Sequence, residues 1–252
     1  MTVEQQENKL KSTEILGFRV HCMNMQEVIN RLEYCINTNE RCHLVTADAS
    51  MMVMAQKDLE LKNIILHAEL VTPDSAGVLW AAKRSGVRLS ERVSGVDIVE
   101  KFCKLSADKE YRIFFFGASE GVAEKAANRM RSLYPGAQIV GTRSGFYTDD
   151  DIPDIIKQIK GSKPDMLCVA LGIPKQEKWI NCYRNELGVP VLIGIGGTLD
   201  VLSGNVKRAP QIMQKLHLEW LWRLLSNPRK ISKVMLLPRF VKLVLWSNGA
   251  AR

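Results

Sequence analysis

Hydrophobic residues follow two patterns along most of the chain. Continuous apolar runs, such as Tyr111-Arg-Ile-Phe-Phe-Phe116 and Met166-Leu-Cys-Val-Ala-Leu171, predict strands that are buried on both faces. Between these runs, apolar residues recur every three to four positions, as in the alanine-rich stretch from Val122 to Tyr134, which predicts helices. Strands and helices in alternation predict an α/β fold of Rossmann-like type, in which helices cover both faces of a parallel sheet.

The pattern divides the chain into three parts. The predicted strands lie at 15–20, 43–48, 70–72, 111–116, 137–141, 166–171 and 189–195. The predicted helices lie at 25–38, 50–67, 77–83, 98–107, 122–134, 152–160 and 175–185. We expect a flexible arm over residues 1–13, an α/β domain over 14–206 and a basic helical appendage over 207–252, with Pro210 close to the last boundary.

Charge is concentrated in the C-terminal appendage. The whole chain carries a net charge of +8, residues 207–252 carry +9, and the rest carries −1. The apolar residues Leu237, Val241, Val244 and Leu245 share one helical face, with Lys230, Lys233, Arg239 and Lys242 interleaved and Trp220, Trp222 and Trp246 as interfacial aromatics. This pattern favours a basic amphipathic helix that lies on an anionic membrane surface.

Other interpretations of the appendage remain open. The same helix can pack on the body with a solvated basic face. Nucleic-acid binding is disfavoured, because leucine and valine outweigh polar side chains that would read bases. An exposed apolar appendage also favours self-association into a homo-oligomer.

Cysteine usage and the N-terminus indicate a cytoplasmic protein. The six cysteines are scattered without a Cys-X-X-Cys pair, and the four histidines show no metal-ligand spacing. Reduced thiols are therefore expected, without zinc or disulfides. Residues 1–12 are polar and do not resemble a signal peptide, and no apolar run reaches the roughly 18–20 residues of a membrane span.

Candidate ligand contacts follow the predicted strands, because open α/β sheets bind ligands at the carboxyl ends of their strands. Gly117 opens a turn that suits a diphosphate, although tight packing explains it equally well. In Gly172-Ile-Pro-Lys-Gln-Glu177, Lys175 could neutralise a phosphate and Gln176 could bind a base or a sugar, or the segment could simply start a helix. Gly196 and Gly197, in the turn that leads to Asp200, permit close approach of a ligand to the backbone.

Asp74 is the candidate general base. It lies where the apolar run Leu70–Thr72 ends and a small-residue helix begins, and a lone carboxylate at such a turn suits proton abstraction. Asp74 could instead cap the helix that follows it. Thr46 and Asp48, at the end of another strand, would form a polar cluster with Asp74 if the two strands are neighbours.

Eight motifs occur in one order along the chain. They are Thr46-Ala-Asp48, Thr72-Pro-Asp-Ser-Ala-Gly77, Glu91-Arg-Val-Ser-Gly-Val-Asp97, Phe116-Gly-Ala-Ser-Glu-Gly-Val-Ala-Glu-Lys-Ala126, Gly172-Ile-Pro-Lys-Gln-Glu177, Gly194-Ile-Gly-Gly-Thr-Leu-Asp200, Lys207-Arg-Ala-Pro210 and Leu218-Glu-Trp-Leu-Trp-Arg-Leu224. In these motifs the chain resembles the WecG/TagA/CpsF glycosyltransferases (glycosyltransferase family 26) over roughly residues 14–246. Within that family it is most similar to the TagA-type members.

The resemblance implies a specific reaction. TagA-type enzymes transfer N-acetylmannosamine from UDP-ManNAc to the C4 hydroxyl of GlcNAc on a polyprenyl diphosphate, which begins the linkage unit of wall teichoic acid. The resemblance implies inversion at the anomeric carbon, no metal and no cofactor, on the inner face of the cell membrane.

The resemblance also assigns roles to residues. Asp74 becomes the base with Thr46 beside it, Gln176 belongs to the donor region, and Arg223 belongs to an appendage that closes over the donor. Arg92 and Asp200 lie in two further motifs and join the substrate-binding candidates. The family often has Asn at the position of Asp48 and Gly at that of Ser75, so the role of Asp48 remains open.

Simple chemistry fits these roles. Displacement at an anomeric carbon needs a base on the acceptor hydroxyl and positive charge near the departing diphosphate. The cationic candidates are Arg208, Arg223, Arg229 and Lys230, because guanidinium groups bind phosphate oxygens in two-pronged geometry. Three alternatives are another UDP-sugar donor (ManNAcA or glucose), a non-catalytic nucleotide-binding protein on membranes, and a nicotinamide-dependent oxidoreductase. The incomplete glycine fingerprint argues against the last.

Overall fold

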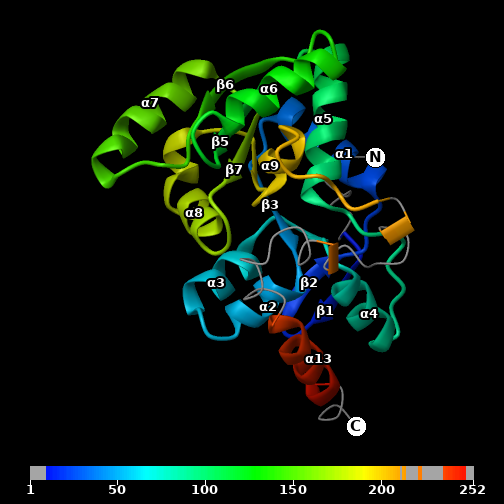
Figure 1. Cartoon of the computed structure of the whole chain (residues 1–252). Coiled ribbons are helices and arrows are strands. Elements are labelled where there is room, and N and C mark those ends of the chain that lie inside the picture. Colours follow the sequence, from blue (N-terminus) through cyan, green and yellow to red (C-terminus); the bar gives the residue numbers. More distant parts are fainter. Residues whose placement is uncertain (1–9, 211, 214–220, 223–234, 248–252) are drawn as a thin grey trace, which may run out of the picture.

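The predicted parallel sheet forms the centre of the molecule (Figure 1). The computed structural model describes residues 10–210, 212–213, 221–222 and 235–247. Its six strands, all parallel, lie in the order β4 (Leu70–Pro73), β3 (Cys42–Ala47), β8 (Val191–Gly194), β7 (Met166–Ala170), β5 (Ile113–Gly117) and β6 (Ile139–Arg143). Their carboxyl ends therefore meet along one edge of the sheet, as the α/β prediction requires.

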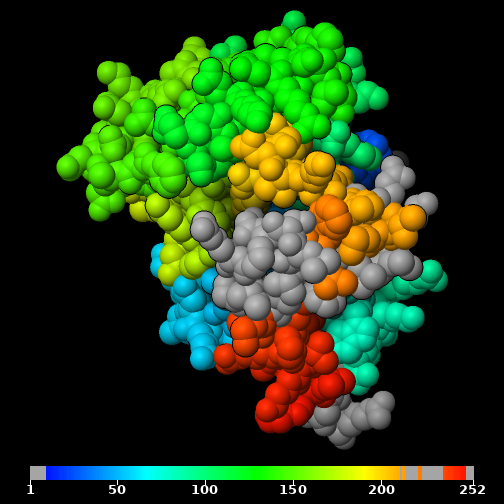
Figure 2. Space-filling model, viewed as in Figure 1, coloured from blue at the N-terminus to red at the C-terminus, as the bar shows by residue number. Residues whose placement is uncertain are grey.

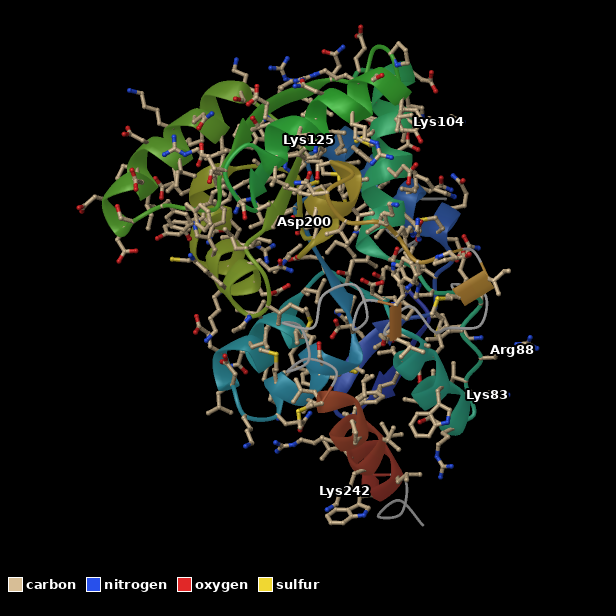
Figure 3. The ribbon with its side chains drawn as sticks, viewed as in Figure 1. Lys83, Arg88, Lys104, Lys125, Asp200 and Lys242 are labelled. Atoms are coloured by element: carbon tan, nitrogen blue, oxygen red, sulfur yellow. The ribbon has the colours of Figure 1, made fainter. Side chains whose placement is uncertain are left out.

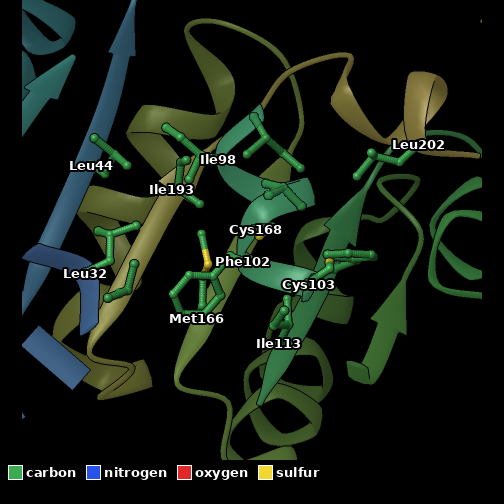
Figure 4. Packing of buried hydrophobic residues seen from close by; sticks show 14 of the residues in the cluster. Leu32, Leu44, Ile98, Phe102, Cys103, Ile113, Met166, Cys168, Ile193 and Leu202 are labelled. Atoms are coloured by element: carbon green, nitrogen blue, oxygen red, sulfur yellow. The ribbon is translucent and has the colours of Figure 1, made fainter. Parts of the chain in front are cut away.

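Helices cover both faces of this sheet. The first face carries α1 (Met25–Thr38), α5 (Gly95–Lys109), α6 (Val122–Leu133) and the short α9 (Thr198–Leu202). The second face carries α2 (Ala49–Ala55), α3 (Leu59–His67), α7 (Ile152–Ser162) and α8 (Lys175–Leu187). Figure 4 shows the core of the first face, where Phe102 of α5 packs among strand residues such as Ile113, Met166 and Ile193. The prediction of an α/β fold with two covered faces is confirmed.

Connections on the two faces run in opposite directions. The helices between β3 and β4 and between β7 and β8 lie on the second face, whereas α6, between β5 and β6, lies on the first. The chain therefore leaves the adjacent strands β5 and β7 in opposite directions, and the same holds for β3 and β8. Such switch points leave a crevice at the carboxyl edge, where α/β proteins bind ligands.

The predicted strand at 15–20 is wrong in detail. The single strand at 15–20 is a hairpin of β1 (Ser12–Ile15) and β2 (Phe18–His21), because Leu16 and Gly17 both adopt positive φ and turn the chain back. Ser12 and Thr13, predicted in the arm, belong to β1.

The single helix at 50–67 is also wrong, because it is two helices. The side chain of Asp58 accepts a hydrogen bond from the Leu61 amide and starts α3 there. The predicted helix at 98–107 begins earlier, at Gly95, because Ser94 caps it.

The described part of the appendage ends in α13 (Leu236–Ser247), which lies against α2 and α4 (Ala76–Arg84) at the lower end of the molecule in Figure 1. Phe240 and Val244 are buried there, and an ideal Cβ on Gly77 of α4 would lie 3.4 Å from the Phe240 ring. Val244, predicted to face lipid, thus faces the body, so the packed-helix interpretation holds for this side.

The outer side of α13 is different. This helix forms the red surface in Figure 2. Val241, Leu245 and Trp246 are exposed, and Nζ of Lys242 lies over the Trp246 ring. None of the helices in the described ranges is both long and apolar enough to cross a membrane.

Candidate active site

Asp74 lies at the carboxyl edge of the sheet, directly after β4. Strands β3 and β4 are neighbours in register, with Ala47 opposite Pro73, and the Asp74 amide donates to the Ala47 carbonyl at 3.0 Å. The helix that follows is capped by Ser75, whose hydroxyl accepts from the Val78 amide at 3.3 Å. The alternative that Asp74 caps this helix is therefore wrong, and its carboxylate is half-buried at the end of the strand.

Thr46 and Asp48 lie beside Asp74, as the sequence predicted for neighbouring strands. Thr46 is buried, and its hydroxyl donates to the Gly194 carbonyl on β8 at 3.3 Å. Asp48 caps α2, because its Oδ1 accepts from the Met51 amide at 2.7 Å and from the Ser50 hydroxyl at 2.6 Å. One of its carboxylate oxygens is thus engaged in holding the helix start.

Arg92 reaches the same edge from the segment before α5. Its neighbour Glu91 accepts from the Met25 amide at 2.6 Å, and its other neighbour Val93 donates to the Pro73 carbonyl at 2.9 Å. Because both flanking residues are fixed, Arg92 is held next to the strand end that carries Asp74.

A carboxylate that the sequence did not single out, Asp97, joins Arg92 to Arg208. Arg208 contacts Asp97 with two nitrogens, Nη1 to Oδ1 at 2.7 Å and Nη2 to Oδ2 at 2.9 Å. Nη2 of Arg92 lies 4.0 Å from Oδ2 of the same carboxylate. Burial raises the pKa of Asp97, but hydrogen bonds from Arg208 and Ser94 and the two arginine charges outweigh it, so the pKa lies below its ordinary value.

Arg208 also borders a cavity of about 490 Å³ between α5, α6, α9 and residues 204–208. This cavity lies on the first face, beside the Asp97 pair rather than at Asp74.

Gln176 ties two ligand-facing loops together. Its Oε1 accepts from the Gly172 amide after β7 at 3.1 Å and from the Gly196 amide after β8 at 2.9 Å. Its Nε2 donates to Oε1 of Glu177 at 2.8 Å, and the side chain is buried. Gln176 thus sets the backbone shape of the loops that a donor would contact.

Gly196, Gly197 and Asp200 continue along the edge after β8. Gly196 has a φ of +52°, and Gly197 precedes α9 without offering a side-chain cap. Asp200 lies on α9 near the centre of the view in Figure 3, and its carbonyl accepts from the Val206 amide at 2.9 Å. This bond turns the chain toward Arg208.

Gly117 and Lys175 lie farther along the sheet. Gly117 is four strand spacings from β4, roughly 19 Å. A Cβ on it would lie 2.5 Å from the Ala170 backbone, so close packing of strand ends by itself requires this glycine. Nζ of Lys175 lies 4.4 Å from the centre of the Tyr147 ring. Neither residue is close to Asp74 across the sheet.

The candidates Arg223, Arg229 and Lys230 lie outside the described residues. Sequence reasoning missed Asp97 as a candidate, although Ser94-Gly-Val-Asp97 matches a helix-start pattern. It also missed Thr72, which is paired with Thr46 in the register of β3 and β4.

A carboxylate and guanidinium groups lie at the same edge of the sheet. A carboxylate not committed to capping can accept a proton, and guanidinium groups nearby can bind an anion. Within the described residues, no three histidine, cysteine, aspartate or glutamate side chains gather in a way that could hold a metal ion.

The chain is similar to known glycosyltransferases over most of its length. The model of the family "Glycosyl transferase WecG/TagA/CpsF" matches residues 13–252. An N-acetylglucosaminyldiphosphoundecaprenol N-acetyl-beta-D-mannosaminyltransferase of Bacillus spizizenii is 34% identical over 86% of this chain and 83% of the relative. Its Bacillus subtilis counterpart is 34% identical over 88% and 86%, and that of Staphylococcus aureus strain MW2 is 29% identical over 96% and 94%.

Proposed function

The chain belongs to the WecG/TagA/CpsF glycosyltransferase family, and from this premise we propose that it transfers N-acetylmannosamine from UDP-ManNAc to the C4 hydroxyl of GlcNAc-diphospho-undecaprenol. The names of its relatives support this donor and this acceptor. The product would begin the linkage unit of wall teichoic acid.

The observation that carries the mechanism is the position of Asp74. Asp74 follows β4 at the carboxyl edge of the sheet, and Ser75 rather than Asp74 caps α4. In this proposal the Asp74 carboxylate removes the proton from the acceptor hydroxyl as that oxygen attacks the anomeric carbon. A single base and direct attack give inversion of the anomeric centre. Thr46 lies in the neighbouring strand, where its hydroxyl helps to hold the reacting sugar.

Positive charge for the departing UDP comes from side chains in this proposal. Arg92 and Arg208 lie near the strand end before Asp74, and Arg223, with Arg229 and Lys230, would complete the cationic group from the appendage. Guanidinium groups stabilise a leaving diphosphate by two-pronged hydrogen bonds, so no metal is required. The acidic run Asp149–Asp151 follows β6, five strand spacings or roughly 24 Å from β4, which is a poor place to bind the same diphosphate.

The donor would extend along the carboxyl edge from Asp74 toward β8 and β7. Asp48, Gly196, Gly197, Asp200 and the loops fixed by Gln176 line that route, with Lys175 and Gly117 at its far end.

The acceptor is a membrane lipid, and α13 offers a surface for a membrane. Its outer side presents Leu245 and Trp246 beside Lys242, which lies at the lower end of the molecule in Figure 3, below Lys83 and Arg88. Since α13 packs on α2 and α4, whose starts flank Asp74, docking there would bring the lipid close to the base. We propose peripheral binding to the cytoplasmic face of the membrane.

Release of UDP tests this function. The purified chain is incubated with a GlcNAc-diphospholipid and either UDP-ManNAc, UDP-ManNAcA or UDP-glucose, with and without EDTA. We expect acceptor-dependent release with UDP-ManNAc that survives EDTA. Preference for another donor would change the substrate, loss in EDTA would overturn the metal-free mechanism, and UDP binding without release would favour a non-catalytic binding protein.

A further inference from the structure

We propose that Asp97 is a positioning residue that holds Arg208, and with it Arg92, in place for the diphosphate of the donor; this inference rests on the sugar-nucleotide donor proposed above. Two arginine side chains close together repel each other, and each loses rotamer freedom when it is fixed. A carboxylate between them offsets both effects before the donor arrives.

The Asp97 carboxylate and the Arg208 guanidinium form a two-pronged contact, here called the clamp. Both of its oxygens bind Arg208, at 2.7 and 2.9 Å, and Oδ2 also accepts from the Ser94 hydroxyl at 2.5 Å. A guanidinium group has five N–H donors, and the two-pronged contact with Asp97 uses two nitrogens on one side of it. The remaining donors of Arg208 are thereby given a fixed direction.

An ordinary helix-start role does not account for this arrangement. In α1, Glu27 occupies the equivalent third position, and its carboxylate accepts from the backbone amide of the capping residue Asn24. In α5, the bonds of the Asp97 carboxylate that the described residues show go to the Ser94 hydroxyl and to Arg208 instead. The Asp97 carboxylate therefore contacts the capping side chain rather than the capping amide, and it also pairs with the arginines.

The clamp also joins three parts of the site. Val93, four residues before Asp97, is bonded to Pro73 at the strand end that carries Asp74. Arg208 lies at the start of the appendage, shortly after α9. Asp97 thus fixes the cationic group relative to the candidate base.

The test measures UDP binding by calorimetry and, in parallel, KM and kcat for the donor. Asp97→Asn keeps the size of the side chain and removes its charge. We expect it to weaken UDP binding and raise the donor KM about tenfold, and to lower kcat as well, because the same arginines stabilise the leaving diphosphate. The matched control is Asp58→Asn, which removes a carboxylate that caps α3 and pairs with Lys178 at 2.8 Å, away from the site; its UDP affinity should stay within twofold of wild type.

A double-mutant cycle separates positioning from a general structural effect. If Asp97 acts through Arg208, then Asp97→Asn should change UDP binding less than twofold in an Arg208→Ala background. Arg208→Lys keeps the charge but cannot make the two-pronged contact, and it should reproduce the loss even if Asp97→Asn does not fold.

Several results would overturn the inference. The first is UDP binding by Asp97→Asn that is unchanged or tighter than in wild type. The second is a loss of UDP affinity in Asp58→Asn as large as that in Asp97→Asn. The third is an undiminished effect of Asp97→Asn on UDP binding in the Arg208→Ala background. UDP binding by a wild-type chain that transfers no sugar would overturn the proposed function alone, because the cycle on UDP binding can still be completed. A wild-type chain that binds no UDP would overturn both.

Discussion

Replacing Thr72 with valine should stabilise the protein. Thr72 and Thr46 lie side by side in the register of β4 and β3, on the same face of the sheet. The Thr46 hydroxyl donates to the Gly194 carbonyl at 3.3 Å. The Thr72 hydroxyl is fully buried, and none of the described residues gives it a hydrogen bond. The two threonines therefore form a matched pair, one satisfied and one not.

The magnitude follows from the cost of an unpaired polar group. A buried hydroxyl without a partner costs about 1–3 kcal/mol, and valine replaces it with a methyl group of similar shape. We expect Thr72→Val to raise the free energy of unfolding by about 1 kcal/mol, which corresponds to roughly 2–4 °C in melting temperature for a chain of this size. Thr46→Val should lower the free energy of unfolding by about 0.5–1.5 kcal/mol, because it removes the hydrogen bond to the Gly194 carbonyl.

Urea unfolding, followed by tryptophan fluorescence and circular dichroism, gives both values. Opposite signs for the two valine variants are the expected result. A loss of 1 kcal/mol or more in Thr72→Val would refute the reasoning, since it would mean that the hydroxyl has a partner such as a buried water.

Three further predictions concern packing, acid stability and membrane binding. Gly194→Ala should lower the free energy of unfolding, measured in urea, by about 1–3 kcal/mol, because its Cβ would lie 2.5 Å from the buried Gln176 amide group. The control is Gly161→Ala, which has open space around it and should not destabilise the protein. Burial, followed by the Arg184 charge, lowers the pKa of His43 to about 4. Between about pH 6.5 and pH 4 only the unfolded chain takes up a proton at this histidine, so the free energy of unfolding should fall as the pH drops through that range. Urea unfolding at the two pH values should show that His43→Leu removes up to roughly 3 kcal/mol of this loss. Arg239→Glu with Lys242→Glu should reduce sedimentation with vesicles rich in phosphatidylglycerol, while urea stability stays within about 0.5 kcal/mol of wild type because both side chains are exposed; equal sedimentation would refute the role of α13.

The sheet was predictable from the sequence because its strands are continuous apolar runs that end in glycine-rich or polar turns. The run at 166–171, for example, corresponds to β7 almost residue for residue. The division of the predicted helix at 50–67 was not predictable from spacing, since apolar residues of α2 and α3 continue the same helical period. Only the backbone geometry at Asp58 reveals the break.

The candidate site was partly predictable for similar reasons. Asp74 was placed correctly at a strand end, but the sequence could not decide whether it or Ser75 caps the next helix, because both residue types are good caps. The role of Asp97 depends on Arg208, which is 111 residues away in the chain, and no local pattern can show such a contact.

The central claim is that Asp74 is the base that activates the acceptor. The most direct measurement compares wild type with Asp74→Asn in acceptor-dependent release of UDP from UDP-ManNAc, alongside the affinity for UDP. The account predicts that turnover falls by about 10²- to 10⁴-fold while UDP affinity stays within a few-fold of wild type. Unchanged turnover in a folded Asp74→Asn variant would contradict it.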